Sequence, residues 1–271
     1  MLINVYIIIT ICKGIGLTSI QQETMTDLVN TLRQIPQHRQ KSEEWLNQRK
    51  GYLTSSDAAT ALGINPYEKP VGLLFKKCNA GKPFTGNIAT RWGEKYEDEA
   101  IEKYCAATGN TTNEFGLIPL VDVYKLINKE YLEGAEILAG SPDGIAINRE
   151  GEPILLEVKC PFRRKIKPGY CPGYYVPQVQ LNMYICNTQK ADFIEYSPDK
   201  SGGNNFTMNI VHFTRDDAWL NRNIPIIVDF WKEVLHYRSC GIETHPDFEK
   251  HRYIEPPIKE IEKVQCMLTD D

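Results

Sequence analysis

The chain has 271 residues and a formal net charge of −4 at pH 7, with the apolar and charged fractions of a globular protein that has a sizeable core. The acidic balance argues against indiscriminate binding to nucleic acid, so any such contact has to come from a local basic patch. No two of the eight cysteines are spaced as C-x-x-C, which leaves a zinc site without support and indicates reduced thiols in an intracellular protein.

The first 20 residues are apolar, and their role stays open. The run is too short to span a bilayer and has no basic leader, so no membrane association is expected. It is a weak signal peptide, a stretch before a true translation start at Met25, or an extra buried strand. We therefore separate residues 1–24 from one domain over residues 25–244, which a polar tail over residues 245–271 follows, with little core expected there.

Helices dominate the first half of that domain. The predicted helices cover residues 23–35, the stretch between Ser42 and Gly51, and residues 54–62, 70–77 and 91–108. Ser42 is a typical residue before a helix, and Pro70 is typical of a first helical position. Gly109 stops the longest of these helices, because glycine readily adopts the left-handed conformation found at helix ends.

Strands appear mainly in the second half. The predicted strands cover residues 115–120, 132–139, 145–147, 154–159, 191–196 and 206–213. Pro177 opens a helix over residues 178–186, and a long helix capped at residues 214–217 runs to about Gly241, bent by Pro225. The order of elements is helices, a strand hairpin, a helix, two strands and a helix. This order favours one α/β domain, with a mixed β-sheet flanked by helices.

The most informative stretch is the hairpin within residues 138–165. Its first turn, Ser141-Pro142-Asp143-Gly144, carries a carboxylate. Because side chains alternate along a strand, Glu157 and Lys159 leave the sheet on the same side. A hairpin of two short strands brings Asp143 back beside Glu157. Two carboxylates and one ammonium group are therefore expected to converge on one point.

Such a cluster is unfavourable without a ligand. Two carboxylates held together repel each other, and each resists losing water. A divalent cation offsets both effects, and oxygen ligands suit Mg2+, with Mn2+ as a substitute, rather than zinc. The alternative is a surface hairpin with an ordinary Glu–Lys pair, which the Pro-Asp-Gly turn upstream disfavours.

Pro142-Asp143 together with Glu157-Val158-Lys159 resembles the PD-(D/E)XK nuclease signature. The fuller strings Ser141 to Gly144 and Leu156 to Phe162 resemble one branch of it, the YqaJ-type viral recombinases of the lambda exonuclease kind. The resemblance spans roughly residues 45–196. It implies a restriction-endonuclease-like core.

The resemblance also implies roles for single residues. The metal ligands would be Asp143, Glu157, Glu97 and the carbonyl of Val158. Lys159 would orient the attacking water, and Gln178 would hold that water or a phosphate oxygen, with Gln180 as the weaker candidate. On the residues alone, Glu97 is one acid among several on a charged helix, and the two glutamines are polar residues near a helix start.

Two further groups would contact the substrate. The string from Trp45 to Ser56 resembles an element in which an arginine and a serine hold a 5′-terminal phosphate. Arg49 would supply a planar donor fork and Ser56 a hydroxyl near a helix start, and Ser55 could share that role. A basic loop after Lys159 either is a solvated surface or contacts phosphates, and we favour phosphate contacts. Its candidate residues are Arg163, Arg164 and Lys165.

These implications converge on a Mg2+-dependent deoxyribonuclease, expected to be a 5′-to-3′ exonuclease on double-stranded DNA ends. Such an enzyme exposes single strands for recombination or viral genome processing in a host cell. The resemblance suggests a ring-shaped homotrimer and a single-strand annealing protein as partner. The alternatives are an endonuclease, an RNA-degrading nuclease of the same fold, and a module that only binds DNA. The complete Asp–Glu–Lys set argues against the last.

Overall fold

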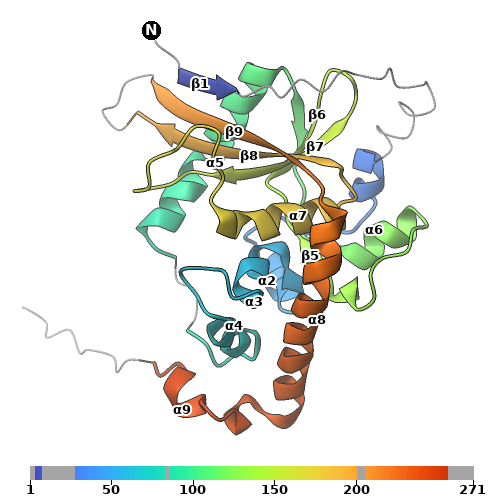
Figure 1. Ribbon diagram of the computed structural model, residues 1–271, viewed down its shortest axis with the longest axis vertical. Helices are drawn as coiled ribbons and strands as arrows, with labels where there is room; N and C mark the ends of the chain where they lie inside the picture. The colour runs from blue at the N-terminus through green and yellow to red at the C-terminus, as the bar shows by residue number, and fades with distance from the viewer. Residues whose placement is uncertain (1–3, 8–27, 83–85, 200–204, 256–271) are drawn as a thin grey trace, which may run out of the picture.

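A six-stranded mixed β-sheet forms the centre of the computed structural model (Figure 1), in which residues 4–7, 28–82, 86–199 and 205–255 are described. From edge to edge its strands are β1 (Asn4–Ile7), β9 (Phe206–Thr214), β8 (Lys190–Pro198), β7 (Pro153–Lys159), β6 (Gly144–Ile147) and β3 (Thr111–Asn113). β1 runs parallel to β9 and β7 parallel to β8, while the other neighbours are antiparallel. β1 shows a strand within the apolar N-terminal segment, whereas Met25 lies outside the described residues.

The predicted hairpin is confirmed. β6 and β7 pair antiparallel, with Gly144 opposite Leu156 and Ile147 opposite Pro153. The parallel strands β7 and β8 need a crossover connection, and α7 (Val176–Ile185) supplies it. Eight of the ten residues of α7 are buried, as expected of a helix that is covered on nearly all sides.

Helices cover both faces of the large sheet. On one face, Ala100 and Tyr104 of α5 (Ile88–Thr108) pack against Leu156, Val158 and Ile194. On the other face lies α7, with α3 (Ala58–Ala61) and α4 (Pro70–Lys77) beyond it (Figure 1). The long helix α8 (Asp217–Cys240) runs past these elements along one side of the molecule. This arrangement agrees with the expected mixed sheet flanked by helices.

A second, three-stranded sheet corrects two predicted strands. It consists of β2 (Leu53–Thr54), β5 (Leu138–Gly140) and β4 (Ile118–Pro119). The strands predicted over residues 115–120 and 132–139 are wrong over most of their length. Residues 115–117 are irregular and helix α6 (Leu120–Leu126) begins where that strand was to end, while a turn and a 3-10 turn (Ala135–Ile137) occupy most of residues 132–139. Short apolar runs do not distinguish a strand from a buried helix by periodicity, which explains the error.

The predicted helix boundaries hold to within a few residues. The side chain of Ser42 accepts from the Trp45 amide (3.2 Å) at the start of α2 (Glu43–Arg49), as expected. α4 has its predicted bounds. α5 begins earlier than predicted, because Asn87 caps it by accepting from the Thr90 amide (2.9 Å). Gly109 ends it with φ +76°. α8 ends at Cys240 as predicted, and Pro225 lies within it.

The remaining helices lie near the two ends of the described chain. Of the helix predicted over residues 23–35, residues 28–33 are helical, and the rest of its first turns lie outside the described residues. Little core was expected after His245, and α9 (Phe248–His251) has no buried residue, although its Phe248 is partly buried against the core. The Phe248 and Phe75 rings stack with centroids 6.1 Å apart. No helix in the described ranges has the length and hydropathy needed to cross a bilayer.

Candidate active site

The turn between β5 and β6 places Asp143 against the middle of β7. The Val158 amide donates to Asp143 Oδ2 (2.6 Å), and the Asp143 amide donates to the Leu156 carbonyl (3.2 Å). These two bonds fix the carboxylate beside the strand that carries Glu157. The sequence-based expectation that the hairpin returns Asp143 to this strand is therefore met.

Glu157 and Lys159 project from β7 toward α7, as the alternation predicts. Glu157 is completely buried, and its Oε1 accepts from the Lys159 ammonium group. Its Oε2 accepts from the side-chain amide of Asn182 on α7 (3.2 Å). Sequence reasoning missed Asn182, because a polar residue on a helix gives no sign of the strand it faces.

Burial and charge together set the protonation of this cluster. Burial raises the pKa of Glu157 to about 7, although Lys159 opposes that shift, and the charge of Asp143 adds to it. Burial also raises the pKa of Asp143. Burial by itself would lower the pKa of Lys159, but the charges of Glu157 and Asp143 raise it overall. Two carboxylates thus share one cation, and a further cation would relieve their remaining repulsion.

Glu97 enters the site from α5. Burial, and then the charge of Asp143, raise its pKa above the ordinary value. Its Oε2 lies 3.7 Å from Nζ of Lys41, a residue that sequence reasoning did not select. Lys41 has φ +69°, a conformation that non-glycine residues seldom adopt and that concentrates at functional sites. Lys41 lies in an irregular loop, and no local sequence pattern predicts that its side chain faces Glu97.

The candidate phosphate pocket lies at the end of α2. Arg49 Nη2 donates to Thr54 Oγ1 (3.0 Å) and Ser56 Oγ (2.9 Å). The guanidinium lies over the Trp45 ring, 4.4 Å from its centroid. The indole of Trp45 in turn donates to Ser141 Oγ (3.2 Å), at the start of the Asp143 turn. The pocket and the acidic cluster are therefore joined by direct contacts.

One cavity of about 550 Å3 unites these groups. Of the predicted site residues, those that line it are Arg49, Ser55, Ser56, Glu97, Asp143, Val158, Lys159 and Gln178. Glu157 lies behind Lys159 rather than in the lining. A second cavity of about 500 Å3 meets the first at Asp143, Glu97 and Lys41.

The phosphate contacts expected of the basic loop after Lys159 stay a prediction. None of Arg163, Arg164 and Lys165 is among the described residues that line the first cavity. Arg164 instead forms an ion pair with the completely buried Glu195 of β8. Asn209 of β9 also donates to Glu195 (3.2 Å). Arg164 therefore anchors the loop to the sheet, whereas Arg163 and Lys165 are exposed.

Two glutamines have structural contacts. Gln180, the weaker candidate, is buried, and it donates to the Thr214 carbonyl (3.1 Å) and accepts from the Asp216 amide (2.8 Å). It thus holds α7 to the start of α8. Gln40, which sequence reasoning missed, donates to the carbonyls of Phe115 (2.8 Å) and Pro142 (3.2 Å). Gln40 therefore braces the turn that carries Asp143.

The donor set fits a hard divalent cation. Asp143, Glu157 and the Val158 carbonyl offer oxygen atoms on adjacent strands, and Glu97 offers a carboxylate from α5. Within the described ranges, no three His, Cys, Asp or Glu side chains are arranged as a ready metal cluster. Lys159 pairs with Glu157 and Lys41 with Glu97. The six described cysteines are free thiols, which is consistent with the reduced state expected from the sequence.

Residues 44–190, more than half of the chain, match the YqaJ-like viral recombinase domain. The protein R354 of Acanthamoeba polyphaga mimivirus is 31% identical over 194 residues, with 67% of this chain and 33% of that protein covered. The protein D345L of African swine fever virus (strain Badajoz 1971) is 29% identical over 186 residues, with 59% and 50% covered. The chain thus spans about a third to a half of the length of these relatives.

Two solved structures have the same fold. LHK-Exo in complex with dAMP superposes with a TM-score of 0.57 at 24% identity, covering 73% of this chain and 95% of that one. LHK-Exo, an alkaline exonuclease from Laribacter hongkongensis, gives a TM-score of 0.57 at 23% identity, with the same coverage. The core is accordingly a restriction-endonuclease-like α/β fold.

Proposed function

The chain belongs to the YqaJ-like viral recombinase family, and on that premise we propose that it is a divalent-metal-dependent deoxyribonuclease that digests double-stranded DNA from its 5′ ends. The observation that carries the proposal is the shared cavity. A hydrolytic cluster around Asp143 and Lys159 opens into the same space as the Arg49–Ser56 pocket. An enzyme that starts at an end needs both a cutting site and a site for the end.

Hydrolysis requires charge control at the reacting phosphate. Asp143, Glu157, Glu97 and the Val158 carbonyl would hold Mg2+, or Mn2+ in its place. That cation would stabilise the negative charge that develops on the phosphate oxygens. The Lys159 ammonium group, held by Glu157 and one quarter exposed toward the cavity, offsets charge and orients water. Gln178, from the first turn of α7, would hold the attacking water or a phosphate oxygen.

Recognition of an end rests on Arg49 and Ser56. A 5′-terminal phosphate carries about one more negative charge than an internal phosphodiester. The guanidinium presents a planar fork of donors that suits such a group. Ser55 lines the same space and, although 2% exposed, offers a second hydroxyl. A charged pocket of this kind is expected to favour 5′-phosphorylated ends over 5′-hydroxyl ends.

The cellular role follows from the same premise. We place the enzyme in recombination or genome processing of a virus inside its host cell, supported by its viral relatives. A ring-shaped homotrimer and a partner that anneals single strands are part of the proposal, and the family resemblance supports them.

The test compares initial rates on duplexes that differ only in their 5′ ends. With Mg2+, the wild-type chain should digest 5′-phosphorylated duplexes faster than 5′-hydroxyl duplexes, while EDTA should stop both reactions. Arg49→Ala should lower the rate on phosphorylated ends roughly tenfold to a hundredfold, since a hydrogen bond to a charged group contributes about 1.5–3 kcal/mol. The rate on hydroxyl ends should hardly change.

The matched control is Arg222→Ala, which removes an exposed arginine of α8 and should alter neither rate. Equal wild-type rates on both ends, together with efficient nicking of a closed circle, would instead indicate an endonuclease. Faster digestion of an RNA duplex would indicate an RNA-degrading enzyme. Binding without release of nucleotides would indicate a DNA-binding module.

A further inference from the structure

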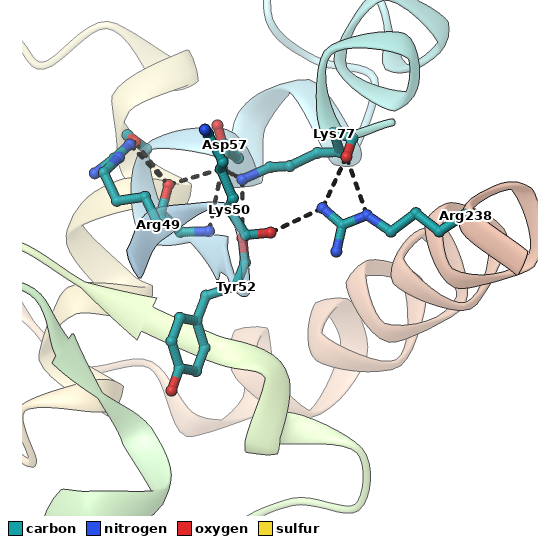
Figure 2. Close-up of polar contacts among 8 residues, drawn as sticks. Arg49, Lys50, Tyr52, Asp57, Lys77 and Arg238 are labelled. Carbon is teal, nitrogen blue, oxygen red and sulfur yellow. Dashed lines mark hydrogen bonds and ion pairs between the residues drawn. The ribbon is translucent and has the colours of Figure 1, made fainter. Parts of the chain in front are cut away.

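A polar network extends behind the candidate phosphate pocket to the long helix α8 (Figure 2). Lys77 of α4 donates to Asp57 Oδ2 (2.8 Å) and to the Tyr52 carbonyl (2.8 Å). The Lys77 carbonyl accepts from Nε (3.0 Å) and Nη2 (2.7 Å) of Arg238. Arg238 also donates to the Lys50 carbonyl (2.8 Å) at the end of α2. α8 thereby holds α2 and α4 together.

Asp57 connects this network to the pocket. Its Oδ2 accepts from Thr54 Oγ1 (2.7 Å) and from the Thr54 amide (3.1 Å). Thr54 is completely buried, and its Oγ1 is also the acceptor for Arg49 Nη2. Among the described contacts, Arg49 is thus linked to Asp57 only by hydrogen bonds through Thr54. Lys77 forms a direct ion pair with Asp57.

This order of contacts has an electrostatic consequence. The side chains of Asp57 and Lys77 are 18% and 11% exposed, so an unpaired charge on either would be unfavourable. Burial by itself raises the pKa of Asp57, but the charges of Lys77 and Arg49 hold it below its ordinary value. Because Lys77 occupies the carboxylate, Arg49 keeps neutral hydroxyl partners. Its charge remains available to an anion in the cavity.

We infer that Lys77 is a positioning residue for the phosphate pocket: it neutralises Asp57 and thereby leaves Arg49 free to bind a terminal phosphate. Arg238 fixes the Lys77 backbone from α8, which lies outside the matched residues 44–190. Without Lys77, the buried carboxylate would draw the Arg49 guanidinium away from the cavity. The inference rests on the proposed function, because it concerns the same pocket.

The test measures the ratio of initial rates on 5′-phosphorylated and 5′-hydroxyl duplexes. Lys77→Met should lower this ratio on the order of fivefold to tenfold, less than Arg49→Ala, because Arg49 is misplaced rather than removed. Lys77→Arg should keep most of the ratio. The double variant Asp57→Asn with Lys77→Met should recover much of it, since no carboxylate remains to capture Arg49.

A second readout does not depend on catalysis. The affinity of a short 5′-phosphorylated oligonucleotide, measured without divalent metal, should follow the same order among the variants. Lys76→Met is the matched control, because this neighbouring lysine pairs with Glu68 (2.6 Å) instead; neither readout should change. Melting temperatures of all variants identify any that fail to fold, and Lys77→Arg and Asp57→Asn retain the shape of the site.

The outcomes separate the two claims. Equal wild-type rates on both ends would contradict the proposed function itself. A wild-type preference that Lys77→Met leaves intact would overturn the inference alone. A double variant no better than Lys77→Met would also overturn it, because a merely structural role for Lys77 predicts that result.

Discussion

Asp143 illustrates how single atoms determine the chemistry of this site. One of its oxygens is committed to the Val158 amide. Burial raises the pKa of both Glu157 and Glu97, and the charge of Asp143 adds to that effect. Gln40 braces the turn from a loop outside the matched residues. The carboxylate is therefore rigidly placed among like charges, an arrangement that favours a bound cation.

Asp143→Asn should abolish hydrolysis while the protein stays folded, because the amide oxygen can still accept from Val158 and one repelling charge is removed. In the wild type, Mg2+ should raise the melting temperature, since a ligand that binds only the native state stabilises it. The variant should lose most of that increase. The measurements are thermal unfolding with and without Mg2+ and the release of nucleotides.

Asp229→Asn, which changes an exposed carboxylate of α8, serves as the control and should behave like the wild type. Full Mg2+-dependent activity of Asp143→Asn would contradict the assignment of this carboxylate as a metal ligand.

At the scale of elements, Asp192 ties α5 to the strand pair β8 and β9. Its buried carboxylate accepts from the Tyr104 hydroxyl (2.7 Å) and contacts Nδ1 of His212 at 2.6 Å. This hydrogen bond raises the pKa of His212 above its ordinary value of 6.5, while burial opposes the shift. The Tyr104 hydrogen bond holds α5, the helix that carries Glu97, against the sheet.

The contact between His212 and Asp192 should make stability depend on pH. A raised pKa in the folded state means that the contribution of His212 is fully present below about pH 6.5 and is lost as the pH rises through the higher folded value. The difference in unfolding free energy between wild type and His212→Gln should therefore shrink over that window. Because His212 is half exposed, this difference in unfolding free energy should be at most about 1 kcal/mol.

Denaturant unfolding at several pH values measures this difference, and His236→Gln on α8 is the control histidine. A difference that stays constant, or grows, as the pH rises would contradict the proposed contribution of the Asp192 contact.

At the scale of the whole molecule, the net charge of −4 leaves DNA binding to local groups. The loop after Lys159 remains the candidate basic surface, but its three residues are not equivalent. Arg164 neutralises the buried Glu195, so removing it would disturb the fold of the loop. Arg163 and Lys165 are exposed and available for phosphates.

Replacing Arg163 and Lys165 together by glutamine should weaken duplex binding and flatten its dependence on salt. The logarithmic slope should fall by about one unit for each phosphate contact that is lost. Titrations of duplex DNA at a series of salt concentrations, without divalent metal, give this slope. Lys232→Gln with Arg222→Gln on α8 is the matched double control, and an unchanged slope in the loop variant would place the loop away from DNA.

Local rules determined much of the site in advance. The alternation along residues 154–159 and the Pro-Asp-Gly turn suffice to bring Asp143, Glu157 and Lys159 together, because both act over a few residues. Capping residues likewise located the starts of α2, α4 and α8. The strands predicted over residues 115–120 and 132–139 were wrong over most of their length, because short apolar runs take their conformation from what they pack against.

The sequence by itself therefore determined the α/β fold, the hairpin and the residues of its acidic cluster, since each depends on neighbours in the chain. Only the tertiary structure showed that Lys41 faces Glu97, that Arg164 is committed to Glu195 and that Gln180 has a structural contact. It also showed that Arg238 contacts Lys77 behind the candidate phosphate pocket. These contacts connect segments far apart in the chain, and their partners are chosen by burial and charge in the folded molecule, which no local pattern encodes.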